Sequence, residues 1–146
     1  MLSTRFQFVA IVAVSLALLP QDVLPLTSAR IMADTLSSSW VLDGTGNWID
    51  PNHWSNGVPV GEIVAIVDNG GVAQITTNVV GPSRTQIGGT STGTVELLSG
   101  SWRQTFLVFA DGPESHGTLR ISGDAEAEFA IASAGSNRTI IQDGGS

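Results

Sequence analysis

Short stretches in which apolar and polar residues alternate fill the second half of the chain, and glycines separate them. The segments GTVELLSG at 93–100 and GTLRISGD at 117–124 both have the two-residue period of a half-buried strand. Beyond residue 33, no window keeps apolar residues at i, i+3, i+4 and i+7 long enough to form a convincing helix. The pattern therefore predicts an all-β fold for this part of the chain.

The predicted strands recur with a period of about 22 residues. An apolar residue followed by a small one occurs at 87–88, 109–110 and 131–132, and the variation in length falls in the turn after it. A fixed period of this size is typical of a solenoid, in which each coil buries its apolar face on the next. We therefore expect a short parallel β-helix. Two internal ladders are predicted, one of Ile87, Phe109 and Ile131, and one of Val72, Val95, Leu119 and Ile140.

Two details of the repeat support stacking of the coils. The small residues Gly88, Ala110 and Ala132 would let the chain turn tightly after the first ladder. Glu96 and Arg120 would be neighbours of opposite charge on adjacent coils. A β-sandwich is the alternative fold, because several short strands at spacings of 8 to 12 residues also fit it. The regular spacing of like residues favours the solenoid.

Residues 1–33 have the three-part layout of a secretory signal. Arg5 gives a positive start, an apolar run covers 8–19, and small residues precede two cleavage points, after Ala29 or after Ala33. The run is shorter than the roughly 20 apolar residues that cross a bilayer, and Pro20 interrupts it. We therefore expect a secreted or cell-surface protein, with no membrane span in the mature chain.

Composition narrows the classes of partner. The chain has no cysteine, so neither disulfides nor thiolate chemistry are available. It has no lysine, and its formal net charge is −7. Binding to nucleic acid depends mainly on attraction between basic residues and phosphates, so nucleic acid is not expected as a partner.

The stretch GTGNWIDPNHWSNGVP at 44–59 has two interpretations. In the structural one, residues 34–64 form a cap in which Trp40, Trp48 and Trp54 fold over the open end of the first coil; such large rings bury much apolar area. In the functional one, Trp48 and Trp54 are platforms for sugar rings. The hydrogen-bonding groups of that carbohydrate site would be Asp50, Asn52, His53 and Asn56. The cap is the favoured interpretation.

Residues suited to catalysis are sparse. Glu126 and Glu128 alternate along a possible strand and could point to one side, but a solvated acidic face explains them more simply. His53 and His116 have no second histidine or cysteine at ligand spacing. The sequence therefore predicts no catalytic centre, no metal site and no cofactor.

Several segments are similar to a known class of surface protein. IGGTSTGTVELLSGSW and FADGPESHGTLRISGDAEAEFAIASAG resemble the glycine-rich repeats of large secreted bacterial proteins, both autotransporter-passenger-like and with PEP-CTERM sorting signals. SWVLDGTGNWIDPNHWSNGVPVGEIVAIVDNG resembles the segment that often precedes such repeats. The resemblance implies a right-handed β-helix outside the cell, with few established activities. This chain differs in having few coils, and its last repeat, within 65–146, is expected to be incomplete.

These observations predict a structural or adhesin-like scaffold that acts through extended surface. The alternative is a carbohydrate-binding module, or the non-catalytic N-terminal part of a polysaccharide-acting enzyme. Expected partners are extracellular glycans or other surface proteins. An uncapped solenoid end presents unpaired strand edges, so self-association through the C-terminal end is also expected.

Overall fold

A computed structural model describes residues 37–109, 112–134 and 137–144. The expected signal at 1–33 and the first residues of the expected cap lie outside the described residues. Within the described part, β-strands dominate and the only helical element is a short 3-10 turn, η1 (Pro51–His53). The all-β prediction is confirmed.

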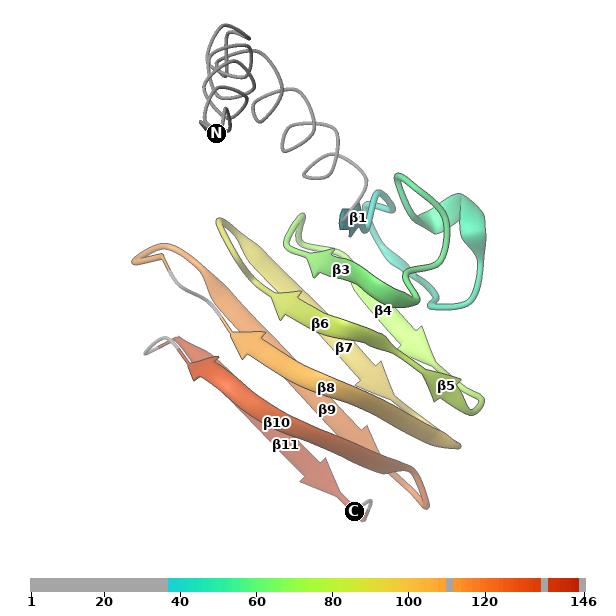
Figure 1. Ribbon diagram of the computed structural model, residues 1–146. Helices are drawn as coiled ribbons and strands as arrows, with labels where there is room; N and C mark the ends of the chain where they lie inside the picture. Colours follow the sequence, from blue (N-terminus) through green and yellow to red (C-terminus); the bar gives the residue numbers. More distant parts are fainter. Residues whose placement is uncertain (1–36, 110–111, 135–136, 145–146) are drawn as a thin grey trace, which may run out of the picture. The chain divides into compact units, whose positions relative to one another are not determined.

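The strands form two sheets (Figure 1). Sheet I consists, in spatial order, of β1 (Ser37–Ser39), β3 (Gly61–Val67), β6 (Pro82–Ile87), β8 (Ser101–Phe109) and β10 (Glu126–Ala134), with β5 (Val79–Val80) also paired to β8. Sheet II consists of β2 (Thr45–Asn47), β4 (Val72–Ile75), β7 (Thr92–Leu97), β9 (His116–Ser122) and β11 (Arg138–Asp143). Each turn of the chain thus contributes one strand to each sheet.

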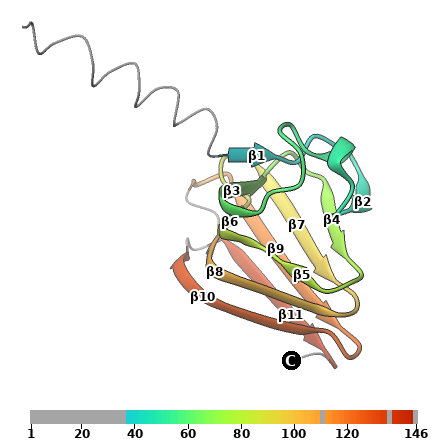
Figure 2. The ribbon, with the colours of Figure 1, turned by 45° about the vertical axis from the view of Figure 1, so that its right-hand side comes forward.

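All pairs between these strands are parallel. Successive coils therefore stack in one direction, as the rotated view in Figure 2 shows. A β-sandwich, the alternative fold, is built from antiparallel strands. The fold is a β-solenoid, as the repeat predicts.

Two of the predicted ladder contacts occur as expected. Ile87 lies opposite Phe109 in sheet I, and Val95 lies opposite Leu119 in sheet II. All four side chains have no exposed area. Their burial confirms that the apolar positions of the repeat face the interior.

The first ladder ends differently from the prediction. Ile131 lies opposite Leu107 rather than Phe109, and its side chain is 46% exposed. The cause is a pair of register shifts in β10, which together pair Phe109 with Ala134. A β-bulge adds an unpaired residue to one strand, so the constant 22-residue spacing breaks there.

The second ladder needs a correction at its start. Val72 pairs with Thr94, and the buried neighbour of Val95 is Ala73. Because successive strand residues point to opposite faces, this difference of one residue turns Val72 away from the core. Ile140 does pair with Leu119, but on the outermost strand of sheet II it stays 44% exposed.

Glycines near the start of the sheet II strands make the coil narrow. A Cβ added to Gly93 would lie 1.8 Å from the carbonyl oxygen of Val67, and one added to Gly117 would lie 2.4 Å from that of Ile87. Gly88 also turns the chain, with a φ of 69°. The side chains of Ala110 and Ala132, predicted to do the same, lie outside the described residues.

Glu96 and Arg120 are neighbours across β7 and β9, as predicted. The Arg120 Nη1 atom lies 3.4 Å from Glu96 Oε1, and the other carboxylate oxygen of Glu96 accepts a hydrogen bond from Gln74 Nε2 at 2.9 Å. These contacts form a polar row across three coils on the outer face of sheet II. The half-exposed Arg120 side chain keeps the ion pair's contribution small.

Candidate functional site

The tryptophans of the first coil pack against each other. Trp54 stands between Trp40 and Trp48, with ring centroids 5.1 Å and 4.8 Å away and interplanar angles of 81° and 69°. These edge-to-face arrangements are the ones that aromatic pairs prefer. The exposed fractions are 2% for Trp40, 0% for Trp48 and 4% for Trp54.

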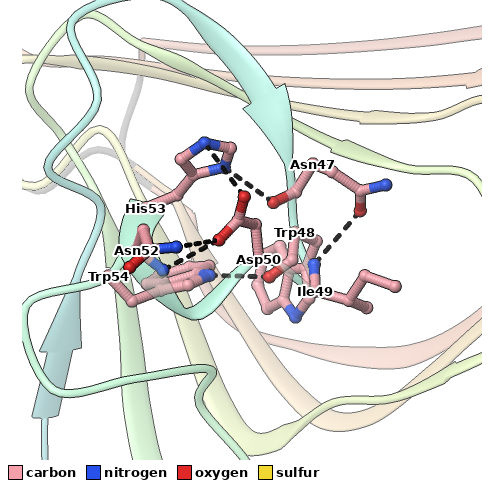
Figure 3. A network of polar contacts seen from close by, with 7 residues as sticks. All are labelled: Asn47, Trp48, Ile49, Asp50, Asn52, His53 and Trp54. Carbon is pink, nitrogen blue, oxygen red and sulfur yellow. Dashed lines mark hydrogen bonds and ion pairs between the residues drawn. The ribbon is translucent and has the colours of Figure 1, made fainter.

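Hydrogen bonds within residues 47–54 fix the loop that carries these rings (Figure 3). Asp50 caps η1, because its Oδ1 accepts hydrogen bonds from the backbone N–H of Asn52 at 2.9 Å and from the Asn52 side-chain amide at 3.0 Å. His53 Nδ1 lies 3.0 Å from the carbonyl oxygen of Asn47. Trp54 Nε1 donates to the carbonyl oxygen of Trp48 at 2.7 Å.

The carbohydrate interpretation of this loop is corrected by the burial of its rings. Trp48 and Trp54 have no exposed face on which a sugar ring could stack. Asp50 and Asn52 bond to each other, and His53 packs edge-on against Trp40 with centroids 5.2 Å apart. The polar groups at the predicted site therefore hold the loop over the rings.

The expected cap is part of the solenoid. β1 pairs with β3, and β2 pairs with β4, so this segment adds one strand to each sheet. β3 spans residues 64 and 65, where the boundary between cap and repeats was expected. The segment is the first coil, with its loop folded inward.

Trp102 extends the tryptophan cluster into the later coils, and the sequence analysis did not single it out. Its ring centroid lies 5.5 Å from that of Trp48 and 6.3 Å from that of Phe129. A continuous row of aromatic rings, which we call the aromatic spine, therefore links the first coil to β8 and β10. The spine consists of Trp40, Trp54, Trp48, Trp102 and Phe129.

A groove of about 410 Å³ crosses the outer face of sheet I. A smaller hollow of about 170 Å³ adjoins it, and both are lined by Arg103 of β8 and Glu128 of β10. Arg103 Nε lies 3.4 Å from Glu128 Oε2, and the two side chains are 67% and 78% exposed. Glu62 lines the groove, and Glu126 lines the smaller hollow. We call these two connected hollows the sheet I groove.

Glu126 and Glu128 do share one face of β10, as their spacing suggests. Both side chains are exposed and line the same hollow. Within residues 37–109, 112–134 and 137–144, no three histidine, cysteine or acidic side chains come together in a way that could hold a metal ion. None of the helical segments in this part is long and apolar enough to cross a membrane.

Comparisons with family models, with curated proteins and with solved structures found no match to this chain. Its function therefore has to be argued from the geometry described above.

Proposed function

We propose that this chain is a secreted or cell-surface β-solenoid that acts as a structural or adhesive scaffold. It would work through the outer faces of its sheets, where side chains from successive coils stand in rows. The proposal does not require a catalytic centre. Its partners would be extracellular glycans or other surface proteins.

The observation that carries the proposal is the use of the large aromatic residues. All four tryptophans are buried in the aromatic spine, and the inward ladder positions are apolar. Residues that could contact a partner are therefore spread over the faces, for example Arg120 with Glu96 on sheet II and Arg103 with Glu128 on sheet I. Such a distribution suits contact with an extended surface better than chemistry at one point.

The outermost strands offer a second kind of contact. β10 and β11 each have one strand edge without a neighbour among the described residues, and Ile131, Ile140 and Ile141 are 46%, 44% and 40% exposed. Exposed strand edges with apolar side chains favour pairing with another chain. Self-association through this end stays a prediction.

Export is the part of the proposal that can be tested first. The full chain with a C-terminal epitope tag is expected to reach the medium, or to lose its tag when intact bacterial cells are treated with protease. A variant that lacks residues 2–33 is the matched control, and it should stay protected inside the cell. A full-length chain that is digested only after lysis would contradict the proposed location.

A further inference from the structure

We propose that the sheet I groove binds a neutral carbohydrate chain, and that Arg103, Glu128 and Phe106 supply the main contacts. The inference rests on the proposed extracellular function and names the surface through which it would act. It moves the carbohydrate interpretation from the buried tryptophans to a different face of the molecule.

The groove follows a line of irregularities in sheet I. β8 carries Gln104 and Thr105 between two residues that pair with β10, while β10 carries only one residue in the same interval. β3 and β6 shift register next to this point, and Gly81 interrupts the strand between β5 and β6. Bulges bend a strand, increase its twist and redirect its side chains. The outer face of sheet I is therefore hollowed at this level across several coils.

Polar groups of both kinds stand together in the groove. The Arg103 guanidinium donates hydrogen bonds and the Glu128 carboxylate accepts them, and their mutual contact is highly exposed. An exposed ion pair contributes little to folding, so its loss on ligand binding is inexpensive. Neighbouring hydroxyl groups of a sugar both donate and accept, and they match this pair. The Thr105 hydroxyl lines the same groove.

Apolar surface lies beside these polar groups. Phe106 directly follows Thr105 and is 45% exposed, whereas the four tryptophans are buried. Val80, which lines the groove, is 79% exposed. An exposed ring beside hydrogen-bonding groups suits the flat C–H face of a sugar. The combination that was predicted for Trp48 and Trp54 occurs here.

The charge and shape of the groove select the class of carbohydrate. Glu62, Glu126 and Glu128 surround Arg103, and the whole chain has a net charge of −7. This excess of carboxylates repels an acidic polysaccharide. The groove is open and crosses strands of successive coils, so an extended chain fits it better than an enclosed small molecule. A neutral glycan meets both conditions.

Affinity electrophoresis of the purified chain would test the site. The neutral probes are soluble xylan, glucomannan and dextran, with polygalacturonate as the acidic probe and polylysine as the cationic one. At least one neutral polysaccharide is expected to retard the chain, and Arg103→Ala and Phe106→Ala are each expected to weaken that binding about tenfold. Arg120→Ala is the matched control, because it removes an arginine with the same 3.4 Å distance to a glutamate on sheet II.

Three results would overturn the inference. They are the absence of binding to every neutral probe, binding that survives both groove substitutions, and binding that Arg120→Ala weakens equally. Stronger retardation by polylysine or polygalacturonate would assign the groove to a charged partner and also contradict it. Because the measurement uses purified protein, its failure leaves the export result unchanged, and a failure of export leaves the groove result standing.

Discussion

Trp48→Ala is expected to lower the free energy of unfolding by about 3–5 kcal/mol, the range for removing a large buried aromatic side chain. Trp48 has no exposed area, and it is the ring that joins Trp54 of the first coil to Trp102 of β8. Its removal breaks two aromatic contacts and leaves a cavity in the middle of the spine. A domain of this size has a total stability of only about 5–15 kcal/mol, so the loss is severe.

Urea unfolding followed by circular dichroism would measure this effect. Ile49→Ala is the matched control, because Ile49 is the next residue along and is 48% exposed. We expect its midpoint to stay close to that of the unchanged chain. Equal midpoints for Trp48→Ala and the unchanged chain would show that the spine does not stabilise the fold.

Gly93→Ala is expected to destabilise the chain by about 3 kcal/mol or more, at the upper end of what overpacking costs. The added Cβ would lie 1.8 Å from the Val67 carbonyl oxygen and 2.6 Å from its carbonyl carbon. Both atoms belong to the backbone of the preceding coil, so no side-chain rotation relieves the clash. The two coils have to move apart, and the hydrogen bonds between them weaken.

Gly44→Ala is the control for this substitution. A Cβ at Gly44 would have no atom within 4 Å, and the position does not need a positive φ. Thermal unfolding should therefore give similar midpoints for Gly44→Ala and the unchanged chain, and a much lower midpoint for Gly93→Ala. A Gly93→Ala chain as stable as the Gly44→Ala chain would contradict the close approach of the coils.

The repeat predicts the solenoid because its physical cause is local. Alternation in GTVELLSG and GTLRISGD sets which residues face inward, and equal spacing brings like residues onto neighbouring coils. The turn that was expected to vary does so: four residues separate β3 from β4, and six separate β8 from β9. The opposite turn has three residues both before β8 and before β10.

Irregular positions are where the sequence misleads. The shifts in β10 depend on how its backbone meets β8, so the spacing between Phe109 and Ile131 gives no sign of them. The same applies to the sheet I groove, whose side chains come from separate coils and converge only after the strands bend. Trp102 was missed because its partners Trp48 and Phe129 are distant in the sequence.

The tryptophan loop shows how one composition can serve two purposes. Aromatic rings beside Asp, Asn and His are typical of carbohydrate sites, and the same residues can also close a core. What separates the two cases is the direction of the rings, which depends on long-range packing. Here the backbone N–H of Trp48 donates to the carbonyl oxygen of Gln74 at 2.8 Å, which places this ring within the first coil.

The central claim is that all four tryptophans form a buried structural spine, and acrylamide quenching of their fluorescence tests it most directly. The account predicts emission at short wavelength and quenching far weaker than that of free tryptophan, unchanged by xylan, glucomannan or dextran. Emission at the wavelength of solvated tryptophan, with strong quenching that one of these glycans reduces, would contradict the account and make the tryptophan loop the binding site.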